Sequence, residues 1–264
     1  MIITDSINHI DKARFSYALG IYKSTDNDST GNRIGTLGEK TMHSVLKWYY
    51  EPDGSRHEVN VGDYIADIVG EGGIIEIQTR NFSHLRRKLN VMLGLCRVTV
   101  VHPIIVNKRI ISVDGTSGEV ISVTNSPKHG SVYTEIRELY TLRDMLGNGS
   151  LTLRLPLLTA DEFRTFGIAT KRRKKQRTRR GEYVSDIIPT DIIDEITLSE
   201  SSDYSILIPD GLPERFGAKE FASAAGTDPA CARMAINLLV RMRIAESVGK
   251  IGNRGIYTLV RGAD

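Results

Sequence analysis

Residues 64–79, with the sequence YIADIVGEGGIIEIQT, constrain the fold of this 264-residue chain more than any other segment. Two runs rich in isoleucine and valine flank a glycine-rich centre at 70–73, and this pattern is typical of a β-hairpin. Whether the loop holds two or four residues, the antiparallel register places Asp67 directly opposite Glu76. Gln78 follows on the same face as Glu76, because successive side chains along a strand point to opposite faces.

The opposed carboxylates of Asp67 and Glu76 indicate either a cation site or a solvated surface pair. Like charges directly opposite each other in a sheet are destabilising, and burial among apolar neighbours raises that cost. A hard divalent cation such as Mg²⁺ removes the repulsion, takes oxygen ligands of this kind and can activate water for hydrolysis. On the alternative interpretation the pair is exposed, or Asp67 bonds neighbouring backbone, and neither acid has a chemical role.

The segments around the hairpin predict further helices and strands. We expect helices at residues 36–50, 82–94 and 131–146. We expect strands, from their β-branched residues, at 57–61, 98–106, 108–114, 118–124 and 150–158. This pattern predicts an α/β domain over residues 1–170.

The order of a helix, a strand ending in Asp67 and a strand bearing Glu76-Ile77-Gln78 resembles the active site of the PD-(D/E)xK, restriction-endonuclease-like superfamily. The sequence ADIVGEGGIIEIQT is particularly similar to the Glu-x-Gln branch, which includes the competence-associated CoiA-like nucleases. The similarity covers roughly residues 35–105. It implies a mixed sheet flanked by helices, and hydrolysis of phosphodiester bonds that depends on Mg²⁺ or Mn²⁺.

The resemblance also implies roles for individual residues. Asp67 and Glu76 would hold the ion, with the Ile77 carbonyl as a third ligand. Gln78 stands where most of the superfamily has lysine, so it brings no positive charge, but its amide can orient a water. Glu39 would be an accessory ligand; alternatively, Thr36 and Glu39 form a capping box at the start of a helix.

Positive charge is concentrated in one segment, residues 171–180 (KRRKKQRTRR). The whole chain has 35 basic and 32 acidic residues, and the segment holds eight of the basic ones and no acid. Such a cluster favours contact with nucleic-acid phosphates, although it can also be a solvated linker. The expected contact residues are Lys171, Arg172, Arg173, Lys174, Lys175, Arg177, Arg179 and Arg180. We predict a basic linker and lead-in over residues 171–212.

Residues 213–264 predict a small α+β domain. A helix is expected at about 216–225, a second from near Pro229 to about 243, and then two strands around the turn GNRG. A helix, a tight turn, a helix and a hairpin are the layout of a winged helix.

The second of these helices carries Arg233, Asn237 and Arg241 at four-residue intervals, opposite an apolar face. Arginine and asparagine suit contacts with base edges or phosphates in a groove. Winged helices also dock proteins, so a protein partner or a second copy of the chain is the alternative.

These observations predict a cytoplasmic, metal-dependent nuclease that acts on nucleic acid, with DNA as the expected substrate. The alternative is a non-catalytic DNA-binding or regulatory protein that keeps a nuclease-like fold. Two lone cysteines, Cys96 and Cys231, fit a reducing compartment. We expect no membrane association, since no apolar run approaches about 18 residues and the N-terminus lacks a secretory pattern.

Overall fold

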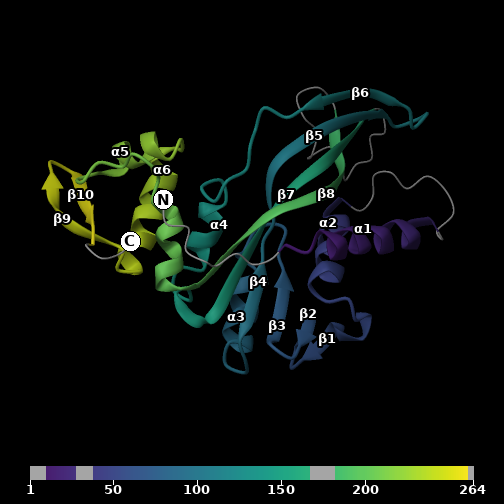
Figure 1. Cartoon of the computed structure of the whole chain (residues 1–264), viewed down its shortest axis with the longest axis horizontal. Coiled ribbons are helices and arrows are strands. Elements are labelled where there is room, and N and C mark those ends of the chain that lie inside the picture. Colours follow the sequence, from purple (N-terminus) through teal and green to yellow (C-terminus); the bar gives the residue numbers. More distant parts are fainter. Residues whose placement is uncertain (1–9, 28–37, 167–181, 261–264) are drawn as a thin grey trace.

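The computed structural model describes residues 10–27, 38–166 and 182–260. An eight-stranded mixed sheet has helices on both faces, and a smaller unit of helices and a hairpin lies at one end (Figure 1). The strands of the sheet are β1 (His57–Val61), β2 (Tyr64–Gly70), β3 (Gly73–Ile77), β4 (Val98–Val101), β5 (Ile104–Asp114), β6 (Val120–Asn125), β7 (Asn148–Phe166) and β8 (Tyr183–Glu200). The helices around it are α1 (Lys12–Asn27), α2 (Gly38–Tyr50), α3 (Leu85–Met92) and α4 (Ile136–Thr141). The predicted α/β class, with a large mixed sheet flanked by helices, is confirmed.

The sheet is built on the long strand β7. Strands β1, β2 and β3 form an antiparallel meander, and β3 then pairs in parallel with β4. Strands β4 and β5 follow one another along the same edge of β7, both parallel to it, while β8 pairs antiparallel with the other edge. His102 and Pro103 separate β4 from β5. Proline has no N–H to donate to the ladder with β7, so the pairing is interrupted there.

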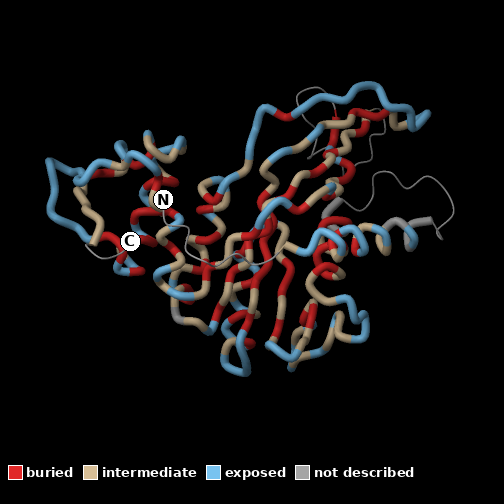
Figure 2. The backbone as a smooth tube through the Cα atoms, in the orientation of Figure 1, coloured by how far each residue is buried: buried red, intermediate tan, exposed pale blue. Residues whose placement is uncertain are grey.

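The two faces of the sheet carry separate apolar clusters. On one face, α1 and α2 cover residues such as Ile68, Ile77 and Val101. On the other face, α3 and α4 cover residues such as Ile74 and Val100. Buried residues follow the central strands, whereas β6 is exposed along its length (Figure 2).

The prediction of a linker over residues 171–212 is wrong for a large part of that range. Residues 183–200 form β8, which pairs with β7 over almost its whole length. The basic segment 171–180 lies outside the described residues. In the sequence it stands between β7 and β8, which pair with each other, so it connects two strands of one sheet and not two domains. Strand β7 also extends to Phe166, beyond the predicted end at residue 158.

The C-terminal unit follows β8 without a break in the core. It contains η3 (Ser201–Leu207), α5 (Ala218–Ala224), α6 (Pro229–Arg241), β9 (Ala245–Ile251) and β10 (Arg254–Leu259). Strands β9 and β10 pair as a hairpin, and Phe216 forms a bridge with Tyr257 of β10. Leu198 of β8 and Leu239 of α6 belong to the same apolar cluster, and α6 packs against α4, so the unit shares one apolar core with the sheet and its helices.

Among the residues that the structure describes, no helix combines the length and the apolar character needed to cross a bilayer.

Candidate active site

The β2–β3 hairpin has the register that the sequence predicts, with a two-residue loop. The pairs Ile68–Ile75, Val69–Ile74 and Gly70–Gly73 are in register, and the next pair in this series is Asp67 and Glu76. At that point the ladder changes character. The Ile77 N–H donates to Asp67 Oδ2 at 2.7 Å, and the Asp67 N–H lies 3.4 Å from Glu76 Oε1. Two side-chain carboxylates thus take positions that backbone carbonyls hold elsewhere in the ladder.

Each carboxylate contacts a basic side chain from a different helix. His43 Nε2 of α2 lies 3.2 Å from Asp67 Oδ1. Lys88 Nζ of α3 lies 2.5 Å from Glu76 Oε2. The Glu76 side chain is 4% exposed and that of Asp67 is 20% exposed. The acid pair is therefore largely shielded from water and compensated from both faces of the sheet.

The two carboxyl groups have pKa values shifted in opposite directions. Burial raises the pKa of Glu76 to about 7; the hydrogen bond from Lys88 opposes this, and the charge of Asp67 adds to it. Burial also raises the pKa of Asp67, but the hydrogen bond and charge of His43 and the Ile77 N–H outweigh it and leave that pKa below its ordinary value. Pairs of titratable groups separated in this way are typical of acid–base sites.

Strand β1 is distorted beside the acid pair. Glu58 has a φ of 54°, in the left-handed region that non-glycine residues rarely adopt. It lies between the pairs His57–Ile68 and Val59–Ala66, and so opposite Asp67. Lys47 Nζ of α2, one turn after His43, holds the Glu58 carboxylate at 2.7 Å. Backbone strain of this kind concentrates at functional sites.

The backbone of β3 directs a further oxygen into the site. The Ile77 N–H donates toward β2, and the N–H and C=O of one residue in a strand point to the same side. The Ile77 carbonyl thus faces the gap that the Asp67 carboxylate occupies. The following peptide is fixed to β4, since the Gln78 N–H donates to the Val101 carbonyl at 2.8 Å.

Gln78 does not direct its amide nitrogen at the acid pair. Its Nε2 donates to the carbonyls of Arg80 and Asn81, each at 2.9 Å, within the turn that follows β3. Its Nε2 is thus engaged within the turn, and the role of Gln78 in orienting an attacking water stays a prediction. Glu39 lies in the first turn of α2, one turn before His43, and its side chain is outside the described part of the structure.

Two residues that contact the acids, His43 and Lys88, were not among the predicted site residues. The signal for Lys88 is its place on α3, beside the buried stripe of Leu85, Leu89 and Met92. A residue next to such a stripe can reach the sheet while its long side chain keeps the charge at the edge. His43 borders the buried stripe of α2 in the same way.

The oxygen atoms of the acid pair are of the kind that hard cations such as Mg²⁺ bind. No group of three or more His, Cys, Asp and Glu side chains that could hold a metal occurs among the described residues. Mg²⁺ commonly binds through one or two carboxylates and keeps several waters. Asp67, Glu76 and the Ile77 carbonyl offer that kind of set, because each carboxylate oxygen can accept more than one bond.

The residues predicted to contact nucleic acid fall into three groups. Lys171–Arg180 lie outside the described residues. Arg233 and Asn237 are exposed on α6. Arg241 instead binds the main sheet unit, donating to the Arg143 carbonyl at 2.8 Å and to Asp144 at 2.6 Å. The predicted stripe on α6 is thus split between a free surface and an internal contact.

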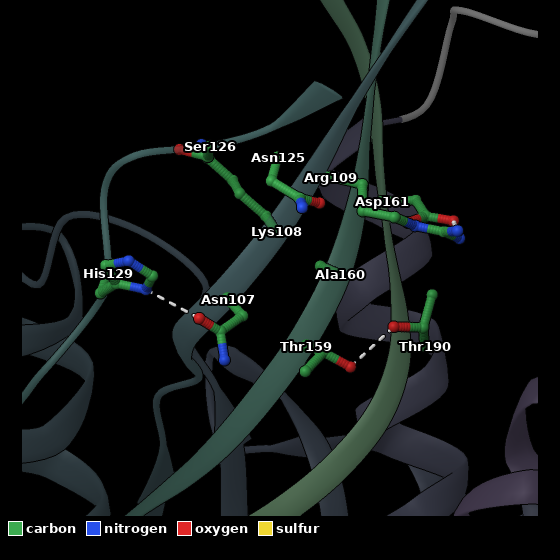
Figure 3. Close-up of a pocket in the computed structure, with 10 residues that line it drawn as sticks. All are labelled: Asn107, Lys108, Arg109, Asn125, Ser126, His129, Thr159, Ala160, Asp161 and Thr190. Atoms are coloured by element: carbon green, nitrogen blue, oxygen red, sulfur yellow. Dashed lines mark hydrogen bonds and ion pairs between the residues drawn. The ribbon is translucent and has the colours of Figure 1, made fainter. Parts of the chain in front are cut away.

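A separate cavity of about 420 Å³ lies where β5 pairs with β7 (Figure 3). Its charged side chains are paired: Arg109 binds Asp161 at 2.7 and 2.6 Å, and Lys108 binds Glu162. Amide and hydroxyl groups make up most of the remaining wall. None of its lining residues belongs to the acid pair or its partners, so the cavity is not part of the candidate site.

Comparison with known proteins places the sheet unit in a family. A family model described as "Domain of unknown function (DUF8091)" matches residues 40–199, more than half of the chain. The chain belongs to this family. An uncharacterized protein of Treponema pallidum (strain Nichols) is 30% identical over 227 residues, which cover 85% of this chain and 86% of the relative. No solved structure matches the chain.

The matched span of the DUF8091 family agrees with the observed architecture. It runs from the start of α2 to the end of β8 and includes both acids, Lys88 and His43. The family unit is therefore the helix-flanked sheet with β8 as an integral strand. Residues 201–264, which hold α5, α6 and the β9–β10 hairpin, lie outside the matched span.

Proposed function

We propose that this chain is a divalent-metal-dependent nuclease with a restriction-endonuclease-like core and a C-terminal winged helix. The observation that carries the proposal is the pair of opposed, shielded carboxylates, Asp67 and Glu76, at the point where the ladder between β2 and β3 ends. Burying two acids side by side costs free energy unless each finds its own counter-charge or both share a cation, and a shared cation is the arrangement that a nuclease uses.

Asp67, Glu76 and the Ile77 carbonyl would hold Mg²⁺ or Mn²⁺, and Glu39 would be an accessory ligand from α2. Such an ion lowers the pKa of a bound water and neutralises charge on the phosphate. Lys88 would supply the positive charge that Gln78 lacks. Its ammonium already lies beside Glu76, and once that acid is compensated otherwise it can turn to the scissile phosphate or the attacking hydroxide.

The C-terminal unit would position the nuclease core on its substrate. The order η3, Phe216, α5, α6 and the β9–β10 hairpin supports the winged-helix assignment. Arg233 and Asn237, exposed on α6, would face nucleic acid, and the basic segment 171–180 would contact phosphates. DNA is the expected substrate, in a cytoplasmic setting.

One observation favours a second candidate, a non-catalytic nucleic-acid-binding or regulatory protein with the same fold. Both acids are already compensated by His43 and Lys88, so the arrangement is self-sufficient as an internal charge network. On this alternative the winged helix and the basic segment bind nucleic acid, and no metal is used.

A cleavage assay separates the two candidates. Single- and double-stranded DNA and RNA would be incubated with the purified chain in Mg²⁺, Mn²⁺ or chelator. We expect metal-dependent cleavage that Asp67→Asn and Glu76→Gln each reduce by at least about a hundredfold. Asp161→Asn, which removes a paired acid on β7 away from the site, is the matched control and should cleave normally.

Cleavage that persists in both site variants would assign the activity to a contaminant or to another site. Binding of nucleic acid without any cleavage, under all metal conditions, would support the non-catalytic alternative.

A further inference from the structure

The two charged partners Glu76 and Lys88 belong to different elements joined by one turn. Glu76 lies on β3, Lys88 lies on α3, and residues 78–84 connect the two elements. Their relative placement therefore depends on how this turn is held. Gln78 stabilises it from within, through its side-chain bonds to the Arg80 and Asn81 carbonyls.

Two side chains from outside the turn form hydrogen bonds with its backbone, one at its start and one near its end. At its start, His102 Nδ1 lies 2.6 Å from the Gln78 carbonyl oxygen. Near its end, the Phe82 N–H donates to Glu138 Oε2 at 2.8 Å. The second ring nitrogen of His102 lies 3.1 Å from Glu135 Oε2, so the residues that begin α4 support both attachment points.

His102 occupies the place where the ladder between β3 and β4 can no longer continue. The last backbone bond between these strands is from the Gln78 N–H to Val101, and the proline at 103 follows at once. At this point the imidazole, in place of a backbone N–H, forms the hydrogen bond with the Gln78 carbonyl. The ring is 3% exposed, and its plane stands edge-on to Phe82 with centroids 4.8 Å apart.

The hydrogen-bond partners of His102 determine its donor pattern. A backbone carbonyl only accepts, so Nδ1 must carry a proton. Burial raises the pKa of Glu135, but the hydrogen bond and charge of His102 outweigh it and leave that pKa below its ordinary value, so the carboxylate also accepts. The contact of Glu135 with Nε2 orients the ring from its other side.

We propose that His102, oriented by Glu135, is a positioning residue that holds the end of β3 and the following turn, and thereby keeps Glu76 and Lys88 in register for the reaction. This inference rests on the proposed nuclease function for its catalytic consequence. The structural part, that the Nδ1 bond to Gln78 orders the turn, does not depend on cleavage.

Two substitutions separate the Nδ1 contact of the imidazole from its Nε2 contact. In His102→Asn the side-chain amide nitrogen reaches about the position of Nδ1 and can keep the bond to Gln78. In His102→Gln the amide nitrogen reaches about the position of Nε2, which keeps the contact with Glu135 and loses the bond to Gln78. The two variants bury a similar polar group, so they form a matched pair.

The full-length chain would be measured in two ways. Solvent exchange of the Gln78 side-chain amide hydrogens, followed by NMR, reports whether the turn is ordered. We expect His102→Asn to keep slow exchange, and His102→Gln to speed it by about tenfold, the equivalent of one net hydrogen bond. Cleavage kinetics should show kcat reduced by roughly tenfold or more in His102→Gln, with KM little changed, and near-normal kcat in His102→Asn.

Equal exchange rates in the two variants would overturn the proposal, because His102 would then be a packing residue only. If the two variants differ in exchange rate but the wild-type chain cleaves no nucleic acid, the nuclease function is refuted and the ordering role of His102 stands. Separation in exchange with equal kcat in both variants would refute the catalytic consequence alone.

Discussion

Replacing Glu76 with glutamine should make the metal-free protein relatively more stable as the pH rises. The folded-state pKa of Glu76 is about 7, against an ordinary value of 4.5, because burial and the charge of Asp67 disfavour ionisation. Between these two values the folded protein keeps a proton that the unfolded chain has lost. Stability of the wild type therefore falls with rising pH over this range, and the amide removes that dependence.

The magnitude follows from the size of the shift. Each pKa unit corresponds to about 1.4 kcal/mol, so a shift of this size changes the free energy of unfolding by about 3 kcal/mol in total. The Glu76 side chain is 4% exposed, so solvent screening reduces this little. Relative to the wild type, Glu76→Gln should gain about 3 kcal/mol between pH 5 and pH 8. The lowered pKa of Asp67 affects stability only below about pH 4, which is outside this pH range.

Glu162→Gln is the matched control, because Glu162 is equally buried and differs in its partners. Its carboxylate lies between Lys108 and Arg164, and their hydrogen bonds outweigh burial and lower its pKa. A lowered pKa adds stability above the ordinary value, and this stability is lost as the pH falls. Glu162→Gln should therefore be less stable than the wild type by a constant amount between pH 5 and pH 8, and this deficit should shrink only below the ordinary pKa of 4.5.

Urea unfolding of the wild type and both variants, with chelator present, measures these differences. The expected result is a difference curve for Glu76→Gln that rises between pH 5 and pH 8, and a difference curve for Glu162→Gln that stays flat over the same range. Parallel pH profiles for the wild type and Glu76→Gln would refute the reasoning, because they would mean that Glu76 is ionised in the folded chain at all these pH values and that its charge is fully compensated.

Three further predictions concern the metal, the C-terminal unit and the basic segment. Mg²⁺ at a hundredfold excess over its Kd should raise the free energy of unfolding of the wild type by about 2.7 kcal/mol and leave Asp67→Asn unchanged, as measured by urea unfolding. Arg241→Ala should lower stability by about 1 kcal/mol, through loss of its bonds to Arg143 and Asp144, without changing affinity for DNA in a binding titration. Neutral substitutions throughout residues 171–175 should weaken binding to all duplexes alike and flatten the salt dependence by about 0.9 per lost phosphate contact.

The hairpin was predictable because its constraint is local. Asp67 and Glu76 are nine residues apart, and alternation along two strands is enough to set them opposite each other. The basic side chains that contact them could not be derived in this way. His43 and Lys88 lie on helices that reach the acids only through tertiary packing, and nothing in a single sequence specifies which residue of a helix flank meets which strand.

Strand β8 was missed because a sequence rule favours a different interpretation. Pro189 and many acidic residues interrupt its apolar pattern, and proline within a run argues against a central strand. Among the described residues, β8 pairs only with β7, and Pro189 stands at a register shift opposite Ala160. An edge strand with a local irregularity tolerates a residue that has no N–H to donate. The rule against proline holds for central strands, and β8 is not one.

The position of Lys88 also bears on the departure at Gln78 from the Glu-x-Lys pattern. A lysine at 78 would extend from the strand that carries Glu76, whereas Lys88 reaches the same carboxylate from α3. The amide at 78 then becomes available for the turn, where its two donated bonds hold the connection to α3. An uncharged residue at 78 and an ammonium at 88 are thus two parts of one arrangement: the glutamine orders the turn that brings the lysine to the acid. For the proposed nuclease, a glutamine at 78 where the resemblance implies a lysine is consequently no argument against catalysis, provided that the turn holds Lys88 in place.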